Sequence, residues 1–227
     1  MKIVALVPYW SNYTYEDNSI DGRDTMLLSG KSLLNYPLLL ANKIKDIDST
    51  YIFTNDNSVE STIQDHLKFE LLHRDQNLDS QNATIEDIVS SFLNVIDCDF
   101  VLLLHPSSPF LQPETISDCI SKVVSGNFDS AFIARREKKF AWFRLERLNY
   151  DTSKGTPHLS NVEPIILEST AAYFFSRNSF NRFKTRIGQK PYVKEVGPFE
   201  GMVVSSKEEL KISEFLLDSG FFVDSKQ

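Results

Sequence analysis

Uninterrupted apolar runs recur along the chain and predict buried strands. Ile3–Val7, Tyr51–Thr54 and Phe100–Leu104 lack the apolar–polar alternation of a strand with one face in water. Such runs are typical of strands covered on both faces, as in a mainly parallel sheet. Ser130–Ala134 and Ala171–Phe175 predict two further strands in the second half of the chain.

Segments with helical spacing lie between these runs. Ser32–Ile44 carries apolar residues at helical spacing, and Thr84–Ile96 opens with a Thr and an Asp three residues apart, close to a capping box. Pro113 predicts the start of another helix, while the capping box Ser206–Glu209 predicts a last helix that ends at Gly220. Strands and helices alternating in this order predict an α/β fold, a three-layer sandwich with a mainly parallel central sheet.

Residues 135–168 interrupt this alternation. The stretch contains Phe140, Trp142 and Phe143 and has no clear helical period. Aromatic side chains need a partner surface, so they either fold back on the sheet or meet a second subunit. We therefore expect one domain over residues 1–227, with an inserted dimerisation segment at about 135–168.

Composition and charge exclude several classes of protein. With 227 residues, 41% of them hydrophobic, the chain is long enough for a single α/β core and is not of a disordered type. A net charge of -7 argues against a broad nucleic-acid surface, and no apolar run approaches the roughly 20 residues that cross a bilayer. Cys98 and Cys119 are too few for a disulfide framework. We expect a cytoplasmic protein with no nucleic-acid or membrane partner.

The loops after the predicted strands are the places to search for a site, because ligands of open α/β sheets bind at the carboxyl ends of the strands. His105 ends a buried strand beside two prolines, which favours a role in binding or proton transfer over a core role. Lys31 is either a solvated lysine at a helix start or a phosphate ligand aided by the helix N-terminus. Arg74 is either a ligand contact or the ion-pair partner of a nearby aspartate.

Three other loop residues also allow two interpretations. Asp56 is either a ligand contact or a helix N-cap, and the cap is the stronger interpretation. Tyr9 and Trp10 either stack on a base or sugar ring, or pack in the core or in a lid.

Several motifs follow one another in a characteristic order. The most specific is Leu103–Pro109, a leucine-rich strand that ends in His-Pro-Ser-Ser-Pro. The others are Gly30–Leu33, Ile52–Asp56, Arg74, Asp129–Ala131 and Trp142–Arg144. Together they resemble the cytidylyltransferases that activate sugar acids, above all the acylneuraminate cytidylyltransferase (CMP-sialic acid synthetase) family, whose corresponding strand ends in Gln-Pro-Thr-Ser-Pro. The resemblance covers the chain from Lys2 to about Leu217.

The resemblance implies a nucleotide-diphospho-sugar transferase-like fold and a homodimer. It also implies transfer of CMP from CTP to a hydroxyl of an anionic sugar acid, with Mg²⁺ as cofactor. Such a transfer needs cations on the triphosphate and an acceptor hydroxyl in line with the α-phosphorus. The catalytic residues implied are Arg23, Lys31 and His105. The nucleotide-binding residues implied are Pro8, Tyr9, Lys31, Arg74, Ser80 and Asp56, and the sugar-binding residues are His105, Ser107, Ser108, Ser169 and Thr170.

The chain departs from this family where phosphate and metal are held. The family's first loop has glycines and cations that hold phosphate, and this chain has Tyr9 and Trp10 there. The family's Asp-x-Asp metal site falls on Val203 and Ser205, so Glu200 is the only acid nearby that could ligate Mg²⁺.

Three functions stay open on this sequence. The first is an active sugar-acid cytidylyltransferase, or a variant acting on a related acceptor. The second is a degenerate homologue that binds a nucleotide or sugar, or scaffolds a partner, without turnover. A glycosyltransferase is the least favoured, because no Asp-containing motif for the metal follows a strand. We expect a cytidylyltransferase-like protein with an altered site.

Overall fold

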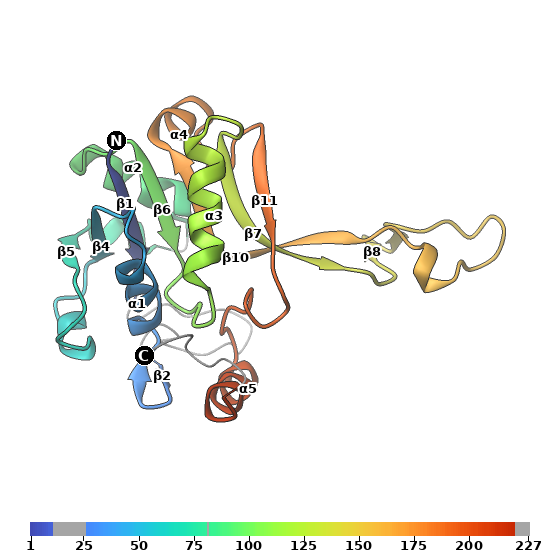
Figure 1. Ribbon diagram of the computed structural model, residues 1–227, viewed down its shortest axis with the longest axis horizontal. Helices are drawn as coiled ribbons and strands as arrows, with labels where there is room; N and C mark the ends of the chain where they lie inside the picture. Colours follow the sequence, from blue (N-terminus) through green and yellow to red (C-terminus); the bar gives the residue numbers. More distant parts are fainter. Residues whose placement is uncertain (11–25, 81, 221–227) are drawn as a thin grey trace.

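A seven-stranded sheet forms the centre of the computed structural model, which describes residues 1–10, 26–80 and 82–220 (Figure 1). The strand order is β11-β7-β10-β6-β1-β4-β5. These strands are β1 (Ile3–Pro8), β4 (Ser49–Thr54), β5 (Glu70–His73), β6 (Phe100–Leu104), β7 (Ser130–Glu137), β10 (Ile165–Ser176) and β11 (Pro191–Glu195).

The sheet is mainly parallel, as the continuous apolar runs predict. The pairs β1–β4, β1–β6, β4–β5 and β7–β11 are parallel, and β10 runs antiparallel to both β6 and β7. The predicted α/β sandwich is therefore confirmed, with one antiparallel strand inside the sheet.

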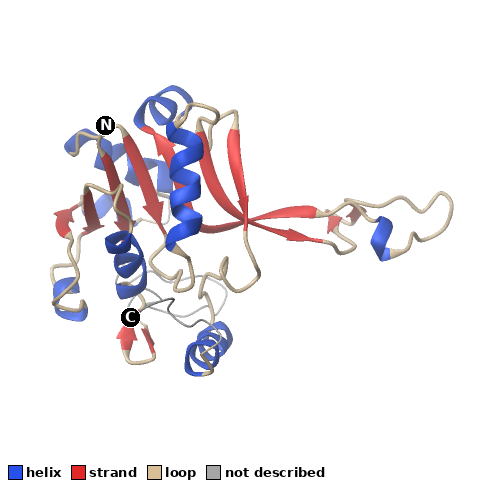
Figure 2. Ribbon diagram, viewed as in Figure 1, coloured by secondary structure: helices blue, strands red, loops and turns tan. Residues whose placement is uncertain are grey.

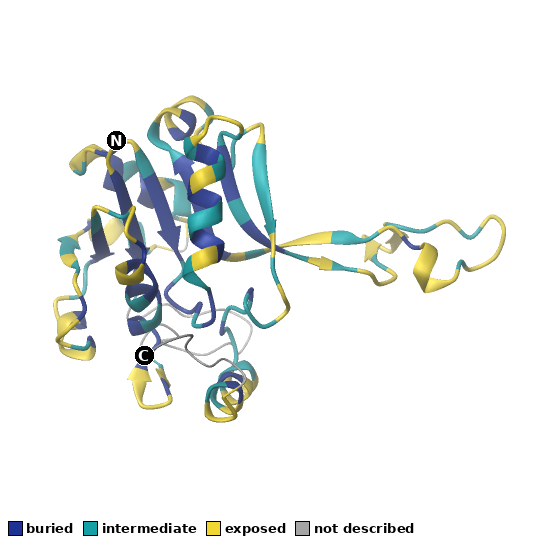
Figure 3. Cartoon of the chain, viewed as in Figure 1, coloured by how far each residue is buried: buried dark blue, intermediate teal, exposed yellow. Residues whose placement is uncertain are grey.

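Helices cover both faces of the sheet, and this explains why the strands are apolar throughout (Figure 2). Ile3, Ala5 and Val7 of β1 share one core layer with α1 (Asn35–Lys43) and α3 (Pro113–Val124). Val4 and Leu6 share the other layer with α2 (Ile85–Val95) and α4 (Arg177–Phe183). In Figure 3 the central strands are accordingly coloured as buried along their length.

Local capping residues set the starts of two helices. The capping box of α2 is present: the Asp87 backbone N–H donates to Thr84 Oγ1 at 3.2 Å, and the Thr84 N–H donates to Asp87 Oδ2 at 2.8 Å. For α5 (Lys207–Asp218) only half of the predicted box forms. The Glu209 N–H donates to Ser206 Oγ at 3.1 Å, but the Glu209 carboxylate accepts from the Ser205 N–H, one residue earlier, at 2.7 Å.

The predicted start of the first helix at Ser32 is wrong, and Lys31 does not lie at a helix start. Helix α1 begins at Asn35, because β2 (Leu27–Leu28) and β3 (Lys31–Ser32) form a hairpin before it. Ser29 and Gly30 connect the two strands with φ angles of 49° and 77°. Two consecutive residues with positive φ are typical of a type I′ hairpin turn.

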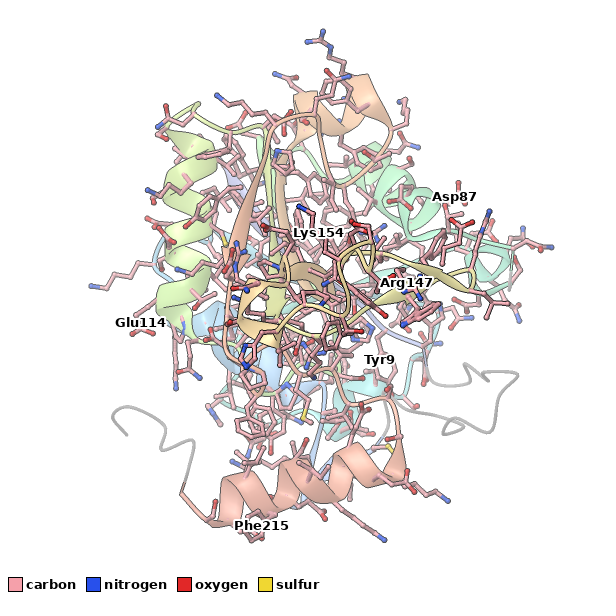
Figure 4. All side chains as sticks on the ribbon, turned by 90° about the vertical axis from the view of Figure 1, so that its right-hand side faces the viewer. Tyr9, Asp87, Glu114, Arg147, Lys154 and Phe215 are labelled. Atoms are coloured by element: carbon pink, nitrogen blue, oxygen red, sulfur yellow. The ribbon has the colours of Figure 1, made fainter. Side chains whose placement is uncertain are left out.

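Residues 135–168 form an arm that projects from the body of the molecule (Figures 1 and 4). The outer halves of β7 and β10 pair along its base, and β8 (Trp142–Phe143) pairs with β9 (Glu146–Arg147) beyond them. Arg147 and Lys154 mark the arm in Figure 4, where it faces the viewer. Trp142 and Phe143 are 56% and 60% exposed, so they do not fold back on the sheet of their own chain.

Three short 3-10 helices complete the described chain, at Val59–Thr62, Gln76–Asp79 and Leu159–Asn161. Among the helices of the described residues, none has the length and apolarity needed to cross a membrane.

Candidate functional site

A cavity of about 290 Å³ opens where β1 and β6 end. Its lining is mostly apolar, with a few polar groups at the wall. This is the composition expected of a small-molecule site. The lining residues come from the ends of β1 and β6, the segment that leads into α2, the start of α2, strand β10 and the loop after α4: Pro8, Trp10, Leu78, Ser80, Ala83, Ile85, Ile88, Leu103, Leu104, His105, Thr170, Tyr173 and Arg186. The structure therefore brings together four predicted site residues, namely Pro8, Ser80, His105 and Thr170.

The backbone around His105 orients its imidazole ring. The His105 N–H donates to the Ala171 carbonyl at 2.9 Å, which fixes the end of β6 against β10. The Ser107 N–H donates to His105 Nδ1 at 3.2 Å. A ring nitrogen that accepts carries no hydrogen, so the neutral ring has its hydrogen on Nε2.

Arg74 is locked inside the protein beside the cavity. Its side chain has no solvent-exposed surface. Its Nη2 donates to the Tyr9 carbonyl at 2.8 Å and to Asp79 Oδ1 at 2.5 Å, and its Nη1 donates to the Phe53 carbonyl. The predicted ion pair with a nearby aspartate is thus the one that forms. Arg74 does not line the cavity; the Trp10 ring, 4.7 Å from its guanidinium carbon, does.

Thr170 lines the cavity with a strained backbone. It lies where the register of β10 against β7 shifts, between Glu168 and Tyr173. Its φ is 58°, in the left-handed region that β-branched residues rarely adopt. A glycine would adopt this φ without strain. Ser169 beside it accepts from the Ala171 N–H at 3.3 Å and does not line the cavity.

Arg186 and Tyr173 form a charged corner that the sequence did not reveal. Arg186 bonds to Glu86 at 2.5 Å and to Glu168 at 3.4 Å, and its guanidinium lies 4.5 Å from the centre of the Tyr173 ring. Burial and a hydrogen bond donated to Glu168 raise the pKa of Tyr173, so it stays a neutral phenol. Glu86 is 100 residues from Arg186 in sequence, so no local pattern could indicate the pair.

Other predicted nucleotide-binding residues lie away from the cavity. Lys31 lines a second cavity of about 360 Å³, together with Lys43 and Phe110. The ring of Tyr9 is 1% exposed and packs in the core with α1 and α3. Asp56 forms a turn, because its Oδ1 accepts from the Ser58 N–H and hydroxyl, each at 2.7 Å. Arg23 lies outside the described residues.

The serines of the His-Pro-Ser-Ser-Pro loop are buried beside the cavity. Ser107 is 0% exposed and its carbonyl accepts from the Val204 N–H at 2.9 Å. Ser108 is 2% exposed, and its N–H donates to the His105 carbonyl at 3.2 Å. Neither serine lines the cavity, so in this structure the loop shapes the site through its backbone.

The residues at the expected metal positions do not fit a Mg²⁺ site. Glu200 caps the N-terminus of α3, where its Oε1 accepts from the Thr115 hydroxyl at 2.5 Å and from the Gln112 N–H at 3.4 Å. Val203 packs against the core, and Ser205 donates its hydroxyl to Glu209 at 2.6 Å. Within the described part of the chain, no group of three or more His, Cys, Asp or Glu residues could hold a metal ion.

Solved structures share this fold. One is CMP:2-keto-3-deoxy-manno-octonic acid synthetase in complex with CTP, with a TM-score of 0.69, 12% identity, and coverage of 96% of this chain and 99% of that one. Another is 4-diphosphocytidyl-2C-methyl-D-erythritol synthase from Anaerococcus prevotii, with a TM-score of 0.66, 13% identity, and coverage of 96% and 98%. At these identities the likeness concerns the fold alone, an α/β sandwich.

The chain belongs to the cytidylyltransferase family, whose profile matches residues 22–200. This confirms the family expected from the motifs. A curated relative is the CMP-N,N'-diacetyllegionaminic acid synthase of Legionella pneumophila, 25% identical over 125 residues, which are 53% of this chain and 52% of that protein. The chain thus matches about half the length of this relative.

Proposed function

We propose that the protein transfers CMP from CTP to a hydroxyl of an anionic sugar acid of the acylneuraminate type. One observation carries the proposal. The family match, over residues 22–200, includes β6 and the loop after it, and the cavity lies at the carboxyl ends of β1 and β6, where α/β sheets bind their ligands. The Legionella relative, named for a CMP-linked sugar acid, supports the choice of acceptor.

The described side chains support binding and orientation in this reaction. The acceptor oxygen forms a bond to the α-phosphorus of CTP, the bond from that phosphorus to the pyrophosphate breaks, and the hydroxyl proton is released. We propose that His105, which lines the cavity and whose ring accepts from the Ser107 N–H, orients an oxygen of the acceptor. Ser80 and Thr170 place hydroxyls at the same cavity.

The use of Mg²⁺ stays a proposal. The residues at the family's metal positions do not fit a protein-held ion, so we propose that Mg²⁺ enters bound to the phosphates of CTP. No step of the reaction is assigned to it.

We also propose that a second copy covers the arm. Several large apolar side chains of this projecting arm are exposed, which is unusual for a surface without a partner. The exposed residues are Phe140, Trp142, Phe143, Leu145, Leu148, Leu159, Ile166 and Leu167. Sedimentation should show a dimer at micromolar concentration, and a protein that stays monomeric there would contradict this. The cytoplasmic location stays a prediction.

Turnover of CTP with candidate acceptors tests the proposed function. The protein is incubated with CTP, Mg²⁺ and a panel of sugar acids, and the CMP-sugar and pyrophosphate are followed by chromatography and phosphorus NMR. Equal amounts of both products are expected, and His105→Ala should lower their rate of formation. Binding of CTP without product from any acceptor would favour the degenerate homologue.

A further inference from the structure

Trp10 contacts a buried cation and also lines the cavity. Trp10 lines the cavity, while Arg74, whose guanidinium carbon is 4.7 Å from the centre of the indole ring, is fully enclosed and does not. A guanidinium stacked on an aromatic face is attracted to it, most strongly when both are desolvated. The orientation of the indole plane is therefore set from inside the protein.

Arg74 cannot leave this place without a large penalty. Its guanidinium donates to Asp79 Oδ1 through Nε at 2.9 Å and through Nη2 at 2.5 Å, and to the carbonyls of Tyr9 and Phe53. A buried charge that loses its partners is strongly destabilising. The guanidinium is thus a fixed support beneath Trp10 and is not a mobile ligand for phosphate.

The same contacts tie together three segments that shape the cavity. The Tyr9 carbonyl follows β1, the Phe53 carbonyl belongs to β4, and Asp79 ends the 3-10 helix that is followed by Ser80. The Arg74 N–H also donates to the Thr54 carbonyl at 3.0 Å. Through these bonds Arg74 fixes the position of Trp10 relative to the lining residues Leu78 and Ser80.

The chemistry of this part of the wall suits a planar ring. Trp10, Leu78, Ala83 and Ile88 give it apolar surface, and Ser80 adds one hydroxyl. An indole face has no donor for phosphate oxygens, but it stacks on any nucleobase. A phosphate-binding loop would instead present glycine backbone amides and cations.

We infer that Trp10 is the stacking platform for the pyrimidine ring of the cytidine nucleotide, and that Arg74 is a positioning residue that acts through Trp10. This rests on the proposed use of CTP. In this assignment an aromatic contact to the base takes the place of the glycine-rich phosphate loop of the family that the sequence resembles. Trp10 stands at the position where this sequence departs from that family.

Tryptophan fluorescence can test the platform directly. In a Trp142→Phe background the emission reports Trp10 alone, because the chain has two tryptophans and Trp142 lies exposed on the arm. CMP should quench this emission. Trp10→Ala, measured by calorimetry, should weaken CMP binding about 10- to 100-fold, the range expected for loss of one stacked base. Trp10→Phe keeps an aromatic face and should retain most of the affinity.

Inorganic tripolyphosphate is the matched probe, since it carries phosphate charge and has no base. Trp10→Ala should leave its affinity unchanged. Equal weakening of CMP and tripolyphosphate by Trp10→Ala would overturn the stacking assignment, because it would indicate a general disturbance of the site.

A double-mutant cycle separates positioning by Arg74 from direct contact. Arg74→Lys keeps the charge but loses the multiple bonds of the guanidinium, so it should weaken CMP binding and change the Trp10 emission. If Arg74 acts through Trp10, adding Arg74→Lys to Trp10→Ala should have little further effect on CMP binding. Fully additive effects would show that Arg74 acts independently of the ring. Thermal unfolding of each variant checks that it is folded.

The outcomes for the inference and for the proposed function differ. A parent protein that binds CMP and turns over CTP, with a Trp10→Ala variant that binds CMP equally well, would overturn the inference alone. A parent protein that binds neither CMP nor CTP would overturn both.

Discussion

Replacing Thr170 by glycine should stabilise the protein, although glycine usually weakens a strand. Thr170 has a φ of 58° and an exposed side chain, so the substitution removes strain and little packing. A left-handed conformation costs an L-residue about 1–2 kcal/mol. Glycine gains more freedom in the unfolded chain, which offsets about 0.4–1 kcal/mol of that relief. The net expectation is a gain of about 1 kcal/mol, or roughly 2–4 °C in Tm for a chain of this size.

The neighbouring residue provides the matched control. Ser169 is in the same bulge, but its φ is not positive, and its hydroxyl accepts from the Ala171 N–H at 3.3 Å. Ser169→Gly should therefore lower the free energy of unfolding by about 0.5–1 kcal/mol, through backbone entropy and the lost bond. Thermal and urea unfolding of both variants gives the comparison. If Thr170→Gly destabilises as much as Ser169→Gly, the strain assigned to Thr170 is refuted.

A functional measurement adds to this test, because Thr170 lines the cavity. Strained residues at binding sites often hold a geometry that the ligand needs. We expect Thr170→Gly to raise Tm and lower the affinity for the acceptor, since the hydroxyl is lost and the segment becomes more flexible. An unchanged affinity would mean that the strain serves the fold and not the site.

Four further predictions follow from particular contacts. Gly188→Ala should destabilise the protein by about 1–3 kcal/mol, because the new Cβ would lie 2.4 Å from Asp129 Oδ1 and the Asp129 carboxylate is held by two backbone N–H groups. Gly197→Ala is the control in the same unfolding assay, because a Cβ at Gly197 would have no atom of the described residues within 4 Å beyond its own residue and its chain neighbours. The hydrogen bond from Lys194 lowers the pKa of Asp118 below its ordinary value of 3.8. The stability that this pair contributes should therefore be present above about pH 4 and be lost as the pH falls through the lowered pKa. Asp118→Asn should abolish this part of the acid dependence, which is at most about 1 kcal/mol for a partly exposed pair. Lys31→Ala should change CMP affinity by less than about twofold, because Lys31 lines the second cavity and exposed charges act weakly over distance. Arg136→Ala, on the outer surface, should have an equally small effect. A tenfold loss of affinity for Lys31→Ala in calorimetry would place Lys31 in the nucleotide site. Calorimetry with Mg²⁺ alone should show no tight binding, since Val203 and Ser205 supply no carboxylate.

The parts of the fold that could be predicted are those encoded locally. Buried strands such as β1 and β6 need apolar residues at every position, so their sequences stand out. The capping box of α2 lies within four residues. By contrast, β5 and β11 are short edge strands whose partial burial depends on neighbours far away in the chain. Pro191 tolerates its place because it begins an edge strand, where the missing N–H is not needed.

The error at Lys31 has a local cause. Apolar spacing through Leu33 and Leu34 suggested a helix from Ser32, and a lysine at its start suggested a phosphate site. The pair Ser29–Gly30 carried the opposite signal, because a glycine in a two-residue loop between strands is typical of a tight hairpin. The hairpin carries Lys31 away from the ends of β1 and β6, and so out of the cavity.

Arg74 is buried in an ion pair, and its place beside Trp10 bears on the site. The sequence offered two interpretations, a ligand contact or an ion pair, and they are linked in the structure. The ion pair with Asp79 holds the guanidinium at the inner side of Trp10, and Trp10 is the residue that lines the cavity. In this chain the loop after β1 begins with Tyr9, whose ring is in the core, and Trp10, whose ring lines the site. The burial of Arg74 and the aromatic residue in this loop are linked in this chain: the cation supports the Trp10 ring, and we infer that this ring meets the ligand.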